Sequence, residues 1–172
     1  MELCFGKYKL RPFRRGDETS LAENINHKKI ERYTLRIPCP YTPANARQWV
    51  NFNLKLVRSK ERPGQLNFAV DLDGRVIGGL GLFNINGHSA ELGYWLGVNY
   101  WGKGIVTAAV KQLTGYALKE LGLVRVYAKV FSANKASARV LEKAGYKYEG
   151  RLRKDCMKRE KPVDSLLFAK TR

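Results

Sequence analysis

The sequence predicts a mixed α/β (α+β) fold, in which a central, mostly antiparallel sheet of seven strands is flanked by about four helices within a single domain over residues 1–172. Two observations support this prediction. Two alternating apolar stretches flank Asp73-Gly74, a dipeptide that favours a tight turn between antiparallel strands. Farther along, a strand, a helix and a second strand follow one another between about 88 and 131, and such a crossover makes the two strands parallel.

The elements follow from hydrophobic periodicity and from the residues that end each run. In chain order they are a strand at 7–14, a helix from 16 to about 29, a helix from 43 to Arg62-Pro63-Gly64, strands at 66–72, 75–83 and 88–98, a helix at 105–121, a strand at 124–131, a helix at 135–144 and strands at 146–153 and 163–170.

Local signals set the helix starts and ends. The first helix is predicted to begin at Gly16-Asp17-Glu18, with acids in its first turn. Thr42 can cap the second helix, and Pro43 suits its first position. Gly122 and Gly145 mark the ends of the last two helices.

Composition excludes several classes of protein. The chain is 44% hydrophobic, and no apolar run approaches the roughly 18 residues of a membrane span. The first residues lack the pattern of a secretory signal, so we expect a cytoplasmic protein with no membrane association. The three cysteines, Cys4, Cys39 and Cys156, form no Cys-x-x-Cys pair, which argues against a disulfide framework or a metal site.

The net charge of +17 is the unusual bulk property. It can reflect a nucleoprotein neighbour or a polyanionic cofactor, or it can be a general basic character without a specific partner. Because the basic residues spread from Lys7 to Arg172, the charge alone leaves both interpretations open.

The strand at 88–98 alternates in character. Its two faces carry Ala90, Leu92, Tyr94, Leu96 and Val98 on one side, and Glu91, Gly93, Trp95 and Gly97 on the other. Glycines leave room above a strand, so the second face is predicted to admit a close neighbour.

The segment from Trp101 to Thr107, called the cradle below, joins this strand to the next helix. Gly102 and Gly104 can turn successive backbone N–H groups toward one ligand, and the first turn of the helix adds unpaired donors, which together suit a pyrophosphate. The spacing matches neither a dinucleotide fingerprint nor a P-loop. A plain turn before a helix is the alternative interpretation.

The order of motifs resembles the GNAT superfamily of acyl-CoA N-acetyltransferases along nearly the whole chain. The resemblance rests on Tyr100-Trp101-Gly102-Lys103-Gly104, on Asn134-Lys135-Ala136-Ser137 and on Gly145-Tyr146-Lys147-Tyr148-Glu149-Gly150. Trp101 and Val106 depart from the general signature but are familiar in the RimJ/RimL group, which acetylates protein N-termini.

The resemblance implies acetyl-CoA as cofactor and a sheet whose fourth and fifth strands splay apart to admit the pantetheine arm. The cofactor-binding residues it implies are Leu96, Gly97, Val98, Trp101, Gly102, Lys103, Gly104, Ile105, Val106, Thr107, Asn134 and Arg139. Lys111 is a further phosphate-binding candidate.

Acetyl transfer needs a neutral amine, a polarised carbonyl and a stabilised thiolate. Glu91 is the candidate base, because no other carboxylate lies between Asp73 and Glu120; the alternative is an ordinary exposed strand residue. The tyrosine that many family members use as acid falls at Leu141, which makes Ser137 the candidate, unless Ser137 only caps its helix. The acid that RimL-like enzymes use as base falls near Asp155-Cys156, where the match is imperfect.

For the acceptor, Tyr33 and Tyr41 lie in a loop that resembles the roof of the family's substrate groove, and packing is the alternative role for both. The preferred acceptor is the N-terminal α-amine of a protein, possible partners include the ribosome, and the chain is expected to be a monomer or homodimer. Alternative functions are acetylation of a polyamine or aminoglycoside, or a non-catalytic basic module on ribosomes or RNA.

Overall fold

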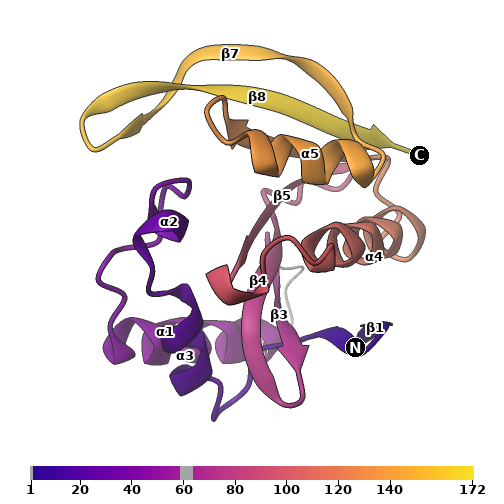
Figure 1. Ribbon diagram of the computed structural model, residues 1–172. Helices are drawn as coiled ribbons and strands as arrows, with labels where there is room; N and C mark the ends of the chain where they lie inside the picture. The colour runs from indigo at the N-terminus through magenta and orange to yellow at the C-terminus, as the bar shows by residue number, and fades with distance from the viewer. Residues whose placement is uncertain (1, 59–63) are drawn as a thin grey trace.

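The structure, a computed structural model, describes residues 2–58 and 64–172 (Figure 1). Within these residues, eight strands form one sheet in the order β1-β2-β3-β4-β5-β6-β8-β7. The strands are β1 (Leu3–Phe5), β2 (Tyr8–Arg11), β3 (Leu66–Leu72), β4 (Arg75–Phe83), β5 (Ser89–Leu96), β6 (Arg125–Phe131), β7 (Lys147–Lys158) and β8 (Lys161–Thr171). Neighbours pair antiparallel except β5 and β6, which are parallel, so the predicted mixed, mostly antiparallel sheet is confirmed.

Helices cover both faces of the sheet (Figure 1). They are α1 (Glu18–Ile25), α2 (Lys28–Glu31), α3 (Pro43–Arg58), α4 (Ile105–Lys119) and α5 (Lys135–Lys143), with a short 3₁₀ turn at Val98–Tyr100. Side chains from α4 and α5 join the larger core cluster, whereas α1 and α3 contribute to a second cluster against the opposite face. None of the helices in the described ranges is both long and apolar enough to cross a bilayer.

The number of strands differs from the prediction because β1 was not recognised. Gly6, at φ 60°, turns the chain so that Leu3 lies opposite Leu10, and the predicted strand at 7–14 is shortened to β2. A strand of three residues is too short to show the alternation on which the prediction depends.

The predicted first helix is interrupted, which gives five α-helices in the described residues instead of about four. The Asn26 side chain accepts a hydrogen bond from the backbone N–H of Tyr41 (2.9 Å). His27 is extended and accepts from the N–H of Lys29 through Nδ1 (3.1 Å), so it caps a new helix, α2. Two polar side chains thus end one helix and start another.

The start of α3 agrees with the prediction. Pro43 is its first residue, and Thr42 Oγ1 accepts from the N–H of Asn45 (3.2 Å) while Asn45 Oδ1 accepts from that of Thr42 (2.8 Å). The predicted end of this helix falls on residues 59–63, outside the described residues.

Candidate active site

The sheet opens between β5 and β6. These strands pair at three positions, the last of which places Glu91 opposite Tyr127. Beyond that pair, β5 continues to Leu96 and β6 to Phe131 without pairing to each other. The structure therefore contains the predicted splay, and the missed strand β1 makes these the fifth and sixth strands instead of the fourth and fifth.

The end of β5 presents backbone groups to this opening. The N–H of Gly97 donates to the carbonyl of Ile77 on β4 (2.8 Å), so it is already used in the sheet. Hydrogen-bonding direction alternates along a strand, so Leu96, opposite Gly78, turns its N–H and C=O away from β4. The Leu96 carbonyl accepts from the indole N–H of Trp101 (2.7 Å), which ties the cradle to β5.

The cradle has the backbone that its glycines permit. Gly102 and Gly104 have φ of 76° and 74°, values that residues with a side chain rarely adopt. A Cβ placed on either would meet no atom within 4 Å, so the space beside them is open. Gly104 leads into α4, whose first N–H groups lack helical partners and point toward that space. The arrangement suits an anion with several oxygens.

The candidate phosphate-binding side chains differ in position. Lys103 Nζ donates to the carbonyl of Asn99 (3.1 Å) and lies 5.7 Å from the ring centre of Tyr100, so it stays beside the cradle. Arg139 is exposed on α5 and forms an ion pair with Glu142 (3.7 Å).

Across the opening, the first turn of α5 carries the candidate acid. Asn134 Oδ1 accepts from the N–H of Ser137 (3.2 Å), so Asn134 is the residue that caps α5. The Ser137 hydroxyl lies 2.7 Å from the hydroxyl of Tyr94 on β5. Leu141, at the position of the family's tyrosine, is fully buried. A tyrosine hydroxyl thus reaches this helix from the neighbouring strand.

The environment keeps Tyr94 protonated. Burial raises its pKa to about 12, and the hydrogen bond to Ser137 opposes the shift only in part. Another pair of hydroxyls, which is fully buried, joins Tyr146, the residue before β7, to Thr114 Oγ1 on α4 (2.6 Å). Burial raises the pKa of Tyr146 as well.

Glu91 lies on the other face of β5, at the mouth of the opening. Its Oε2 accepts from the side-chain amide of Asn84 (2.9 Å), a residue held at φ 51°. Lys129 on β6 forms an ion pair with Asp155 (3.1 Å). Burial would lower the pKa of Lys129, but the charges of Asp155 and Glu91 raise it overall. Asp155 is within ion-pair distance of this ammonium group, whereas Glu91 acts on it only through its charge.

Burial raises the pKa of the thiol of Cys156, the neighbour of Asp155 in the sequence.

The glycine-rich face of β5 admits close neighbours, as predicted, and these neighbours are side chains of the chain itself. A Cβ on Gly81 or Gly93 would lie 2.6 or 2.9 Å from the ring of Phe83. A Cβ on Gly79 would lie 2.6 Å from the indole nitrogen of Trp95. The glycines make room for two aromatic side chains of the chain itself.

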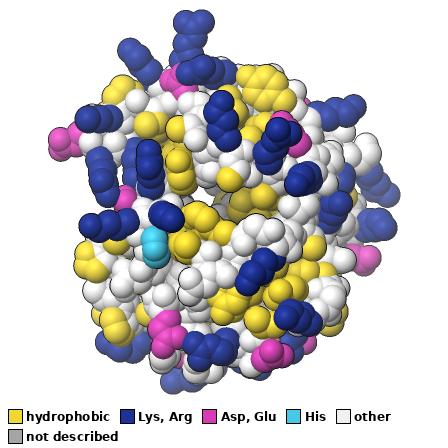
Figure 2. Space-filling model, in the orientation of Figure 1, with side chains coloured by type: hydrophobic (Ala, Val, Ile, Leu, Met, Phe, Trp, Pro, Cys, Tyr) yellow, Lys and Arg dark blue, Asp and Glu magenta, His cyan; other side chains and the backbone are white. Residues whose placement is uncertain are grey.

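A contact between distant segments closes one side of this region. Glu31 at the end of α2 forms ion pairs with Lys158 and Arg159 at the β7–β8 tip, each at 2.6 Å. Lys158 Nζ also donates to the carbonyl of Thr34 (2.6 Å). The hydrogen bond from Lys158 is the main reason that the pKa of Glu31 is lowered. In Figure 2 the surface is hollowed at its centre, between the half with β7, β8 and α5 and the half with α1 and α3.

The two roof tyrosines have different surroundings. Tyr41 is 8% exposed and packs in the second core cluster with Phe13 and Leu21. Its prediction as an acceptor contact is therefore replaced by a packing role. Tyr33 is half-buried, beneath the guanidinium of Arg32 at 5.4 Å.

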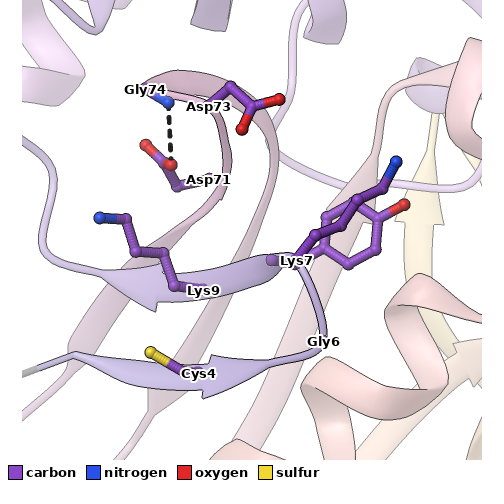
Figure 3. Close-up of a pocket in the computed structure, with 8 residues that line it drawn as sticks. Cys4, Gly6, Lys7, Lys9, Asp71, Asp73 and Gly74 are labelled. Atoms are coloured by element: carbon purple, nitrogen blue, oxygen red, sulfur yellow. Dashed lines mark hydrogen bonds between the residues drawn. The ribbon is translucent and has the colours of Figure 1, made fainter.

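A hollow elsewhere on the surface is unrelated to these residues. It has a volume of about 280 Å³ and lies between the β1–β2 hairpin and the β3–β4 turn (Figure 3). Within it, Asp71 accepts from the N–H of Gly74 (3.1 Å), and none of the site residues above lines it. Among the described residues, no three His, Cys, Asp or Glu side chains gather in a way that could hold a metal ion.

Three functional candidates were missed by sequence reasoning. Tyr94 was counted only as an apolar strand position, although a buried tyrosine hydroxyl needs a partner and could have been flagged for that reason. Asn84 and Lys129 gave no signal, because their proximity to Glu91 depends on strand pairing.

Comparison with known proteins identifies the family of the chain. A family model described as "Acetyltransferase (GNAT) domain" matches residues 7–147. A probable N-acetyltransferase of Bacillus subtilis, YjcK, is 46% identical over 86 residues, 48% of each chain, so the match spans about half of that relative. The spermidine N(1)-acetyltransferase of Escherichia coli K12 is 27% identical over 146 residues, 84% of this chain and 75% of that protein.

Solved structures show the same fold. A ribosomal-protein-S5-alanine acetyltransferase from Vibrio fischeri superposes with a TM-score of 0.86 at 25% identity, over 99% of this chain and 96% of that one. RimL, a ribosomal L7/L12 α-N-protein acetyltransferase solved with coenzyme A, gives 0.87 at 18% identity, over 99% and 98% of the two chains. With the family model covering most of its length, the chain belongs to the GNAT acetyltransferase family, and it is an N-acetyltransferase that uses acetyl-CoA.

Proposed function

We propose that this enzyme acetylates the N-terminal α-amine of a protein, as members of the RimJ/RimL group do. The observation that carries the proposal is the pairing of acidic side chains with cations near the acceptor side. Acidic side chains around the acceptor side are already compensated by cations of the same chain. Glu31 is held by Lys158 and Arg159, and Asp155 by Lys129.

A polyamine brings several positive charges and needs spare carboxylates to bind. Glu23 on α1 is likewise paired, with Arg75 (2.6 Å). With a net charge of +17, the protein repels a free polycation. A protein terminus presents a single amine, for which Glu91 alone is sufficient.

The names of two structural neighbours, which refer to ribosomal proteins S5 and L7/L12, support a ribosomal acceptor. A strongly basic enzyme is attracted to an anionic ribonucleoprotein surface, and such attraction weakens with added salt. The neighbours' names and the positive charge both fit an enzyme that meets its acceptor on an assembled ribosome. Such an enzyme would work in the cytoplasm, as a monomer or a dimer.

The residues fit coenzyme A. The cradle offers open space beside two left-handed glycines and the first turn of α4, and the opening between β5 and β6 can take a narrow arm. When bound, acetyl-CoA supplies the activated acetyl group. The Leu96 N–H would polarise its carbonyl, the Asn134 amide would contact the arm, and the cradle amides would hold the pyrophosphate.

Base and acid lie on opposite faces of the sheet. Glu91 is on the face of Phe83 and Trp95, where it would take a proton from the acceptor amine, directly or through water. Ser137 is on the face of α5, where it would donate a hydrogen bond to the sulfur. The opening between the strands lets both groups serve one reaction by direct attack in a ternary complex.

Spermidine is the second candidate acceptor, because the E. coli spermidine acetyltransferase matches over most of its length. Acetylation of a panel of peptides with varied first residues, alongside spermidine and an aminoglycoside, would distinguish the acceptors. We expect higher kcat/KM for at least one peptide. Faster acetylation of spermidine than of every peptide would overturn the proposal.

Gly104→Val should weaken acetyl-CoA binding by about ten- to a hundredfold, the loss expected for one charge-assisted hydrogen bond. A β-branched residue is strained at φ 74° and moves the amides of the cradle. Calorimetry with acetyl-CoA measures the change. Gly122→Val is the matched control, because Gly122 lies beyond the other end of α4 at φ 69°, also in open space. Equal affinity in both variants would remove the cradle from the binding site.

A further inference from the structure

Two hydroxyl groups face each other where β5 and β6 have separated. Tyr94 belongs to β5, and Ser137 to the first turn of α5, the helix that follows β6. The pair, 2.7 Å apart, therefore joins the two sides of the opening.

The hydrogen bonds around Ser137 leave two possible acceptors for the hydroxyl proton of Tyr94. Its N–H is taken by Asn134, and its carbonyl accepts from the Tyr94 hydroxyl at 3.1 Å. The single phenol proton can be directed to that carbonyl or to Ser137 Oγ. In the first arrangement the serine proton points back at Tyr94, whereas in the second it is free to point at a third atom.

We propose that Tyr94 is a positioning residue, which donates to Ser137 Oγ and so directs the serine O–H toward the sulfur of coenzyme A. The inference rests on the proposed function, in which Ser137 serves the departing sulfur. Charge that develops on the sulfur favours the second arrangement, because an O–H donor aimed at an anion forms the stronger bond.

Tyr94 acts without giving up its proton. Its pKa of about 12 compares with about 8.5 for an ordinary thiol, so proton transfer to a thiolate would be unfavourable by more than a thousandfold. The phenol therefore remains a hydrogen-bond donor at neutral pH. The role is one of orientation, and no bond to hydrogen has to break at Tyr94.

The test compares Tyr94→Phe with Tyr146→Phe. The control removes one hydroxyl from another tyrosine that has a hydroxyl partner, Thr114 at 2.6 Å. The readout independent of turnover is the pKa of the thiol of bound coenzyme A, followed by the ultraviolet absorbance of the thiolate during a pH titration. We expect this pKa to rise by about one unit in Tyr94→Phe, the size of one charged hydrogen bond, and to stay unchanged in Tyr146→Phe.

The same variant should lower kcat about tenfold, with the KM for acetyl-CoA within about twofold, because binding is preserved. In a Ser137→Ala background, Tyr94→Phe should have no further effect on the thiol pKa. An unchanged thiol pKa in the single variant would overturn the inference. An equal shift without Ser137 would also overturn it, since Tyr94 would then act on the sulfur directly.

Calorimetry with coenzyme A on the wild-type protein distinguishes a failure of the proposed function from a failure of the role of Tyr94. Failure of the wild-type protein to bind coenzyme A would contradict the proposed function itself. Normal binding with a thiol pKa that does not respond to Tyr94 would contradict only the role of Tyr94.

Discussion

Glu91→Gln should lower kcat at neutral pH by about a hundredfold or more, the usual contribution of a general base, while acetyl-CoA affinity changes little. The substitution keeps the shape of the side chain and its acceptor oxygen for Asn84 but removes its basicity. An α-amine has a reference pKa of about 7.7–8.0, so the defect should shrink as pH rises and the amine loses its proton unaided. Steady-state rates between pH 6.5 and 9.5 with a good peptide substrate measure both effects.

Two further variants show whether the loss of activity is specific to Glu91. Asp155→Asn removes the other carboxylate that faces Lys129 and should have a smaller effect. Asn84→Gly preserves the positive φ and removes the amide that holds Glu91, so its loss should be intermediate. A fully active Glu91→Gln with an inactive Asp155→Asn would transfer the base role to Asp155.

Features that are local in the chain could be predicted. The Asp73-Gly74 turn joins β3 to β4 with both residues at positive φ, as its sequence indicates. Pro43 starts α3, and Gly102 and Gly104 have the backbone angles that a glycine pair before a helix suggests. In each case a few adjacent residues determine the geometry.

Features that depend on distant contacts could not be predicted. The β7–β8 turn uses Arg159 and Glu160 at φ 48° and 62°, without the glycine or asparagine that usually marks such a turn. Arg159 in this turn also contacts Glu31, 128 residues away in the sequence. The hairpin is consequently longer than the predicted strands at 146–153 and 163–170.

In the candidate site, too, some residues could be predicted from the sequence and others depend on distant contacts. Glu91 and Ser137 stand out by residue type and by position in motifs, whereas Tyr94 becomes a candidate only when β5 and α5 are seen side by side. Tyr41 had an attractive residue type in a suitable loop, but the loop folds inward and the ring enters the core.

Asp17 lies at the predicted start of α1, but its side chain has a different role from the one expected. It was expected to favour the start of α1 electrostatically, yet its side chain makes no capping hydrogen bond to that helix. Instead it accepts two hydrogen bonds from the guanidinium of Arg11, both at 2.8 Å. Arg11 Nε also donates to Asp71 on β3 (2.7 Å), and all three side chains are 2% exposed. The triad joins β2, β3 and the start of α1.

Arg11→Met should therefore destabilise the protein by about 3–5 kcal/mol, the cost of stranding buried charges whose partner is lost. Methionine keeps much of the apolar volume, so the effect isolates the charge. Burial alone would lower the pKa of Arg11, but its hydrogen bonds to Asp17 and Asp71 and their charges raise it overall, so the guanidinium stays charged. Chemical denaturation gives the free energy of unfolding, and the Tm should fall by roughly 10 °C.

The exposed pair of Arg75 and Glu23 is the matched control, because its contact is as short (2.6 Å) while its side chains are 61% and 54% exposed. Arg75→Met should cost less than about 1 kcal/mol. Neutralising the stranded acids in Arg11→Met/Asp17→Asn/Asp71→Asn should recover part of the lost stability, since two buried charges are removed. If Arg11→Met were no more destabilising than Arg75→Met, the triad would contribute no more than a surface pair, and the packing of β2 against β3 would have to account for the stability of this end of the sheet.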